Sequence, residues 1–191
     1  LSLSAAAQSN PLWMRYSSIS PDGQTIVFSY KGDVFSVASS GGNAHQLTSN
    51  AAYDAYPIWS PDGSHIAFAS SREGSLDVYV MDKNGGEPKR LTTSSNDETP
   101  IAWRDNDHIL FGSDGMQTAK SIYFPGSQFP QVYEVDLQAD RPKLFSAVNM
   151  EDLSINQNGD ILYQDKKGYE DLFRKHHQSP ITRDIWINRK G

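Results

Sequence analysis

Cysteine is missing from all 191 residues of this chain, which excludes a disulfide framework and thiolate chemistry. No stretch approaches the roughly 20 consecutive apolar residues that a membrane-spanning helix needs. Basic residues are outnumbered, with 17 Lys and Arg against 23 Asp and Glu. The net charge of −6 therefore argues against a nucleic-acid partner, because such partners are usually bound through a basic patch.

One unit is repeated along the chain. Its clearest part is the tetrapeptide Ser-Pro-Asp-Gly, at residues 20–23 and again at 60–63. After each tetrapeptide come an Ile-x-Phe strand pattern, an Asp-Val-aromatic triplet, a Gly-Gly pair and a Leu-Thr pair. Two weaker copies follow, with Arg-Asp-Asn-Asp at 104–107 and Asn-Gln-Asn-Gly at 156–159 in the turn. A period of about 40 residues filled with short alternating strands predicts the blades of a β-propeller.

The repeat predicts an all-β fold of about four four-stranded antiparallel blades, within a domain that spans residues 11–191. We place the blades at residues 13–50, 51–94, 95–148 and 149–191. In the second blade we expect strands at 55–60, 65–70, 77–82 and 88–93. The last blade is incomplete, so we expect these blades to be part of a larger propeller, and edge-to-edge self-association is possible at an unpaired edge.

Two positions of the repeat hold an aromatic residue in every copy. Phe28, Phe68, Phe111 and Tyr163 occupy the position in the second strand, and Phe35, Tyr79, Tyr133 and Trp186 the position in the third. Large rings at a fixed place in each blade predict packing between neighbouring blades, because they bury much area. A ligand-binding aromatic stripe is the alternative.

Catalytic and metal-binding patterns are weak in this sequence. Asp22 and Asp62 lie in the Ser-Pro-Asp-Gly turns, where turn chemistry explains them better than calcium binding or catalysis. There is no G-x-S-x-G motif, no phosphate-binding loop and no usual metal-ligand spacing around His176 and His177. The expected innermost strands 15–20 and 55–60 contain no acid, which argues against a glycosidase. We therefore expect neither an enzyme nor a cofactor in this chain.

The junction between the second and third strands is short in the first two blades, where we expect it at residues 31–32 and 72–75, and long in the last two. It covers residues 115–130 in the third blade and 167–182 in the fourth. Equivalent loops emerge on one face of a propeller, and insertions gathered there often mark the working surface. We expect this face to contact a peptide or another protein domain; mutual packing of the loops is the alternative. The candidate residues are Tyr123, Phe124, Phe129, Tyr169, Phe173, Arg174, His176, His177 and Arg183.

Residues 1–8, Leu-Ser-Leu-Ser-Ala-Ala-Ala-Gln, are small and apolar, and the chain begins without Met. Residues 5–7 are Ala-Ala-Ala, which is typical of the A-x-A cleavage site of a secretory signal peptide. We interpret residues 1–10 as a signal-peptide remnant, or otherwise as a disordered tail. The first interpretation places the protein in a periplasm or outside the cell.

The repeat, Ser-Pro-Asp-Gly-x-x-Ile-x-Phe followed by Asp-Val-Tyr, Gly-Gly and Leu-Thr, resembles the propeller repeat of TolB and of tricorn-type proteases over residues 13–191. Segments 167–171, 174–177 and 182–186 are similar to the N-terminal propeller of exported tricorn-like serine peptidases. The resemblance implies a non-catalytic propeller that binds or gates peptides and scaffolds partner domains, with the catalytic domain elsewhere. A TolB-like protein-protein interaction module without a peptidase is the alternative.

Overall fold

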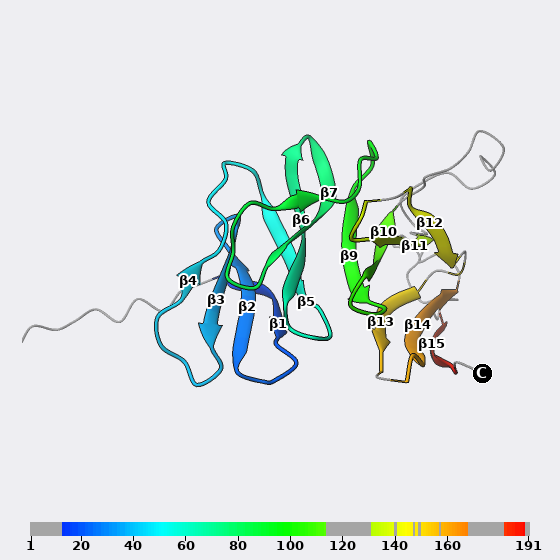
Figure 1. Ribbon diagram of the computed structural model, residues 1–191. Helices are drawn as coiled ribbons and strands as arrows, with labels where there is room; N and C mark the ends of the chain where they lie inside the picture. Colours follow the sequence, from blue (N-terminus) through cyan, green and yellow to red (C-terminus); the bar gives the residue numbers. More distant parts are fainter. Residues whose placement is uncertain are drawn as a thin grey trace, which may run out of the picture.

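The computed structural model describes residues 13–113, 131–139, 141–146, 148, 150–156, 158–167 and 182–189, and every helix or strand element among them is a β-strand (Figure 1). The strands form four antiparallel sheets, and each sheet contains strands that are consecutive in the chain. Three sheets have four strands and the last has three. This confirms the predicted propeller blades, including the incomplete fourth one. The described residues contain no helix long and apolar enough to cross a bilayer.

We call these sheets blades 1 to 4. Blade 1 consists of β1 (Arg15–Ile19), β2 (Thr25–Tyr30), β3 (Asp33–Ala38) and β4 (His45–Gln46). Blade 2 consists of β5 (Asp54–Trp59), β6 (His65–Glu73), β7 (Ser75–Asp82) and β8 (Lys89–Arg90). Blade 3 consists of β9 (Glu98–Trp103), β10 (His108–Ser113), β11 (Gln131–Asp136) and β12 (Lys143–Ser146). Blade 4 consists of β13 (Met150–Ile155), β14 (Ile161–Lys167) and β15 (Thr182–Asn188).

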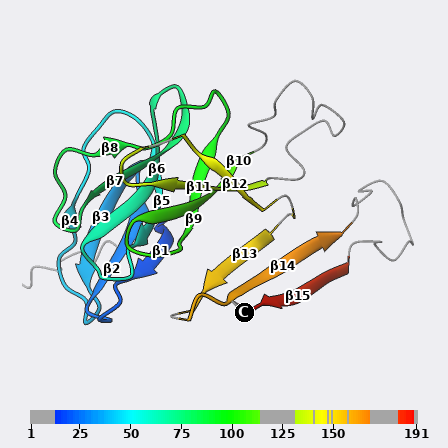
Figure 2. The same ribbon diagram turned by 45° about the vertical axis from the view of Figure 1, so that its right-hand side comes forward.

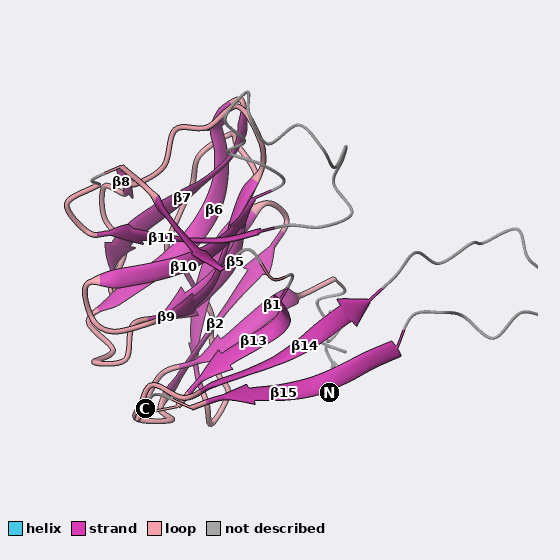
Figure 3. Ribbon diagram, turned by 90° about the vertical axis from the view of Figure 1, so that its right-hand side faces the viewer, coloured by secondary structure: helices cyan, strands magenta, loops and turns pink. Residues whose placement is uncertain are grey.

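The blades follow one another through space in chain order, with blade 1 and blade 4 at opposite ends (Figures 1 and 2). The first strand of each blade faces the inside of this arrangement, where β1 contacts β5 and β5 contacts β9. Seen from the side of blade 4, β13, β14 and β15 form the outermost sheet of the row (Figure 3). We call β1, β5, β9 and β13 the inner strands.

All four strands of blade 2 differ from the prediction at one end or at both, most at the outer strand and at the junction of the second and third strands. The outer strand β8 covers only Lys89–Arg90, because the next residues use another hydrogen-bond pattern: the Thr92 hydroxyl accepts the Val78 amide at 2.9 Å. In blade 1 the Thr48 hydroxyl accepts the Val34 amide at 3.0 Å. This shared hydrogen bond explains the threonine of the recurring Leu-Thr pair. The predicted junction at 72–75 is shorter than expected, because β6 and β7 extend until only Gly74 separates them.

The repeated aromatic residues are direct cross-strand partners, as in Phe68 opposite Tyr79. Their rings stack with centroids 5.9 Å apart, and the other described ring pairs are Phe28 with Phe35 at 5.9 Å and Phe111 with Tyr133 at 5.7 Å. Phe68 and Tyr79 pack on Val27 and Val34 of blade 1. Phe111 and Tyr133 pack on Ala67, Val78 and Val80 of blade 2. The predicted packing between blades is therefore confirmed at these two interfaces.

Each blade thus has a front face, which carries the aromatic pair, and a rear face, which the following blade covers in blades 1 to 3. The front face of blade 4 packs on Leu110 and Val132 of blade 3. On its rear face, the apolar side chains of Leu162, Ile185 and Ile187 are 43%, 74% and 59% exposed. Among the residues that the structure describes, none covers this apolar face of blade 4.

Candidate functional site

The predicted loop residues lie mostly outside the described part of the chain. This holds for Tyr123, Phe124, Phe129, Tyr169, Phe173, Arg174, His176 and His177. The backbone of Arg183 belongs to β15, opposite Lys166 of β14, but its side chain is not described. The strands that flank both loops are described: one loop joins β10 to β11 and the other joins β14 to β15.

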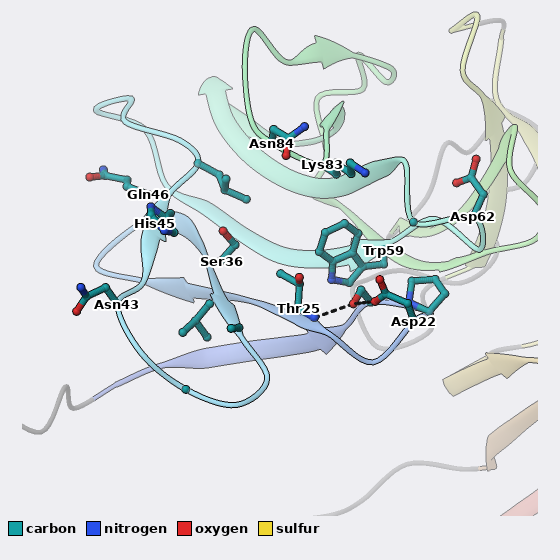
Figure 4. Close-up of a pocket in the computed structure, with 17 residues that line it drawn as sticks. Asp22, Thr25, Ser36, Asn43, His45, Gln46, Trp59, Asp62, Lys83 and Asn84 are labelled. Atoms are coloured by element: carbon teal, nitrogen blue, oxygen red, sulfur yellow. Dashed lines mark hydrogen bonds between the residues drawn. The ribbon is translucent and has the colours of Figure 1, made fainter.

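A groove of about 1140 Å³ lies between blades 1 and 2 on the face of the Ser-Pro-Asp-Gly turns (Figure 4). The two turns and Trp59 form one side of it, the segment around Asn43 and His45 another, and Lys83 with Asn84 closes the third. Most of the labelled side chains are polar. The groove can therefore hydrogen-bond to a polar ligand, on the face opposite the β2–β3 hairpin.

The two acids in this groove belong to the turns. The Asp22 carboxylate accepts the Ser20 hydroxyl at 2.6 Å and the Gln24 amide at 3.0 Å. The Asp62 carboxylate likewise accepts the Ser60 hydroxyl at 2.6 Å. This hydrogen bond is the main cause that lowers the pKa of Asp62 to about 2. Both carboxylates thus make the hydrogen bonds that the turn-chemistry interpretation expects.

Three tyrosines gather on the inner strands, and sequence analysis did not single them out. Tyr16 in β1 and Tyr56 in β5 have ring centroids 3.9 Å apart, and Tyr53 lies just before β5. Tyr16 and Tyr53 are 37% and 42% exposed. Arg15 lies beside them, with its guanidinium 5.3 Å from the centroid of the exposed Trp13 ring. We call these five residues the inner-strand aromatic cluster.

The backbone has a positive φ at equivalent positions of three inner strands, at Tyr16, Tyr56 and Asp152. Tyr16 and Tyr56 have φ values of 54° and 56°, which bulky residues rarely adopt. Both residues lie where the pairing of the inner strand with its neighbour shifts register, between Arg15 and Ser18 and between Ala55 and Ile58. Such strain costs roughly 1–3 kcal/mol. Asp152 in β13, with a φ of 50°, lies at the same kind of register shift, between Glu151 and Ser154. The β-bulge is therefore a repeated feature of the inner strands, and it can re-aim a side chain.

Tyr16 raises the pKa values of the two tyrosines near it. A side-chain hydrogen bond with Tyr16 is the largest cause that raises the pKa of Tyr56 to about 12. Burial is the main cause that raises the pKa of Tyr53, and a bond with Tyr16 adds to it. The positive charge of Arg15 opposes both shifts. Tyr53 and Tyr56 therefore remain neutral at physiological pH.

Buried ion pairs support this end of the inner strands. Asp54, at the start of β5, is fully buried and bonds the Arg72 guanidinium at 2.9 Å. Asp77 is fully buried in the same way and bonds Arg90 at 2.8 Å. Burial is the largest cause that raises the pKa of Asp33, Asp77 and Glu98. These groups lie between strands rather than in a cleft, so we assign them a structural role.

Residues 11–191 match a protein family described as the tricorn protease N-terminal beta propeller domain. The chain belongs to this family. This tricorn-type propeller is 30% identical to tricorn protease homolog 1 of Streptomyces coelicolor over 101 residues, which are 52% of the propeller chain and 9% of that protein. It is 32% identical to a TolB homolog of Chlorobium luteolum over 65 residues, covering 34% of the chain and 15% of that protein.

Solved structures agree on the fold. The propeller matches a putative TolB from Agrobacterium tumefaciens with a TM-score of 0.71 at 16% identity, over 94% of this chain and 59% of that one. It matches the tricorn protease with a TM-score of 0.71 at 19% identity, over 95% of this chain and 18% of that one. The chain therefore spans only part of the length of these relatives. The match shows a shared fold and does not assign the activities of the longer proteins to this chain.

Proposed function

We propose that this tricorn-type propeller is a non-catalytic segment of an exported tricorn-like peptidase, where it binds or gates peptides and scaffolds partner domains. The observation that carries the proposal is the family match, which extends over residues 11–191. The exposed aromatic side chains of the inner strands support a peptide ligand, since tyrosine and tryptophan supply rigid contact area with a polar end. The alanine-rich start supports export to a periplasm or beyond.

The loop face is the proposed entry side for the peptide. Its candidate contacts are the residues expected from the sequence, from Tyr123 in the third-blade loop to Arg183 in β15. The inner-strand aromatic cluster lies toward the same end of the blades, because Arg15 pairs with Ser29, one residue before β2 ends at Tyr30. Two independent features therefore support one side of the propeller as the peptide-binding side.

The scaffold role is proposed for the rear face of blade 4. The register-equivalent faces of blades 1, 2 and 3 are each covered by the next blade. The occupant that fits Leu162, Ile185 and Ile187 is thus another β-blade with an aromatic pair on its front face. Edge-to-edge pairing of two copies, predicted from the sequence, remains the alternative arrangement.

A TolB-like interaction module without a peptidase is the second candidate. The similarity to TolB proteins favours it, because the match reaches 59% of the Agrobacterium chain. The two candidates differ in their ligand. A peptidase-linked propeller binds unstructured peptides of many sequences, whereas a docking module binds a folded partner.

Peptide binding can be measured on the 191-residue chain with a fluorescently labelled mixture of short peptides of random sequence. We expect saturable binding, and the triple variant Arg174→Ala, His176→Ala, His177→Ala should weaken it about fivefold or more. Arg141→Ala, which removes one exposed positive charge near the outer edge of blade 3, is the matched control and should bind normally. No binding of the mixture would contradict the peptide-binding function, and unchanged binding by the triple variant would contradict the role of the loop.

A further inference from the structure

We propose that Glu98 carries a proton in the folded chain and makes the packing of blades 2 and 3 sensitive to pH, so that this interface loosens when Glu98 ionises. Glu98 is the first residue of β9, which packs on β5, β6 and β7 of blade 2. Its side chain is fully buried, and no donor in hydrogen-bonding geometry among the described residues reaches either carboxylate oxygen. A buried carboxyl group without a partner keeps its proton, because the charged form would lose its hydration without compensation.

The arginine that acts on Glu98 is already bonded to another acid. This residue is Arg90 of β8, and its guanidinium bonds the Asp77 carboxylate at 2.8 Å. Asp77 is also fully buried, and its negative charge opposes a second charge on Glu98. Two buried acids therefore share one arginine, and ionisation of Glu98 would leave one buried negative charge unbalanced.

The other strands packed against β9 bring no unpaired arginine or lysine to Glu98 among the described residues. Arg72 of β6 is bonded to Asp54 of β5 at 2.9 Å. Ser113 of β10, which stands opposite Glu98 in the sheet, is uncharged. Two further acids near this end of the strands act on Asp77, namely Glu73 and Asp97. The surroundings of Glu98 thus favour its neutral form.

The direction of the pH effect follows from the burial of this carboxyl group. Burial is the largest cause that raises the pKa of Glu98, and the charge of Asp77 adds to the shift. Some neighbours oppose the shift without cancelling it: Thr92, Ser94 and Arg90. An acid with a higher pKa in the folded chain binds more protons when folded than when unfolded. Its contribution to stability is therefore lost as pH rises above 4.5, the ordinary value for glutamate, and through the folded pKa.

The interface between blades 3 and 4 shows that such an acid is not needed for packing. Met150 begins β13 as Glu98 begins β9. Gln131 precedes Val-Tyr in β11, as Asp77 precedes Val-Tyr in β7. Apolar side chains join blades 3 and 4 with uncharged residues at both positions. The acids between blades 2 and 3 therefore add a response to pH that the apolar packing alone does not have.

Hydrogen exchange of the intact chain and of Glu98→Gln, compared at the same pH, tests this response. Glu98→Gln keeps the shape of the side chain and cannot ionise. At about pH 8 the amides of β7 and β9 should exchange about threefold or more slowly in Glu98→Gln, because the unbalanced charge is gone. At about pH 5 the two proteins should exchange equally, since Glu98 is neutral in both.

A direct measurement follows the proton itself. In carbon NMR of the intact chain, the Glu98 carboxyl carbon, assigned through the backbone, should titrate above pH 4.5. Glu98→Met copies the residue that begins β13, so it should fold and show the same slow exchange as Glu98→Gln. Glu87→Gln makes the same chemical change at an exposed residue of blade 2, and should leave exchange in β7 and β9 unchanged at both pH values.

Three outcomes would overturn the proposal. The first is a Glu98 carboxyl group that titrates at or below the ordinary value for glutamate. The second is equal exchange of the intact chain and Glu98→Gln at the higher pH. The third is exchange that slows by the same factor at both pH values, because this would assign Glu98 a packing role that does not depend on its proton.

Discussion

The most consequential single residues of this propeller are arginines that neutralise buried acids. Asp54 has no exposed surface, and its carboxylate bonds Arg72, whose side chain is 14% exposed. The Arg72 guanidinium also lies 5.7 Å and 5.3 Å from the ring centroids of Phe68 and Tyr79. One side chain thus joins the inner strand to the stacked aromatic pair of blade 2. Loss of the Arg72 side chain would leave the Asp54 carboxylate with neither solvent nor an ion-pair partner.

Replacing Arg72 with Met should therefore destabilise the fold by about 3 kcal/mol, the usual cost of leaving a buried charge unpaired. Urea unfolding followed by circular dichroism measures this change. The double variant Arg72→Met, Asp54→Asn removes the stranded charge and should recover a large part of the loss.

Arg104→Met is the matched control for that measurement. Arg104 pairs with Glu134 in blade 3, but the Arg104 side chain is 41% exposed, so the loss should stay below about 1 kcal/mol. Equal losses for Arg72→Met and Arg104→Met would show that the burial of Asp54 is not what makes Arg72 important.

Among the elements, the hairpin between β2 and β3 contains a lysine at a turn position that this residue type does not favour. Tyr30 pairs with Asp33, so Lys31 and Gly32 form a two-residue turn. Their φ values are 53° and 93°, which matches a type I′ turn. Glycine meets this requirement at no cost, but lysine does not, and asparagine is the residue that such a turn prefers at the first position.

Lys31→Asn should consequently raise the free energy of unfolding by about 0.5 kcal/mol, because asparagine tolerates a positive φ better than lysine. Chemical denaturation at equilibrium measures the gain. Lys31→Gln removes the same charge but keeps a side chain that resists a positive φ, so its stability should stay within about 0.3 kcal/mol of the original. An equal gain in both variants would assign the effect to charge and refute the turn argument.

The sequence predicted the strands well because the first two blades repeat the same turn and every blade repeats a pair of aromatic residues. Ser-Pro-Asp-Gly fixes where the first strand ends, and alternation fixes the next two strands. The outer strand was predicted too long, since Thr92 takes up the Val78 amide with its side chain instead of its backbone. A side-chain hydrogen bond of this kind does not alter the hydrophobic pattern, so the pattern could not reveal it.

The inner-strand aromatic cluster could be read from the sequence only in part. Tyr16 and Tyr56 each stand four residues before the serine of a Ser-Pro-Asp-Gly turn, which is a signal in register. Their positive φ values and the shift in strand pairing leave no mark on the alternation of apolar residues. The contact between the rings also joins two blades, and periodicity does not say which residues of neighbouring blades meet. The residues expected on the loops remain predictions.

Across the whole molecule, the stability of each blade depends on how many of its faces are covered. Blades 2 and 3 pack on a neighbour at both faces, as the three apolar clusters between successive blades show. Blade 4 packs on blade 3 alone among the described residues, and Ile185 and Ile187 on its rear face are exposed. In a row of repeats, stability is a sum of repeat and interface contributions, so the blades should not open together.

Native-state hydrogen exchange should show this gradient. In the isolated chain we expect the amides of β6, β7, β10 and β11 to exchange slowest and those of β15 to exchange fastest, because β15 lies at the outer edge of the described sheet.

One buried and one exposed substitution test whether packing between blades causes this gradient. Val78→Ala, at the interface of blades 2 and 3, should cost about 2 kcal/mol and speed exchange in both blades. Ile185→Ala should change stability by less than about 0.5 kcal/mol. Uniform exchange over all four blades would instead mean that the propeller unfolds as one cooperative unit.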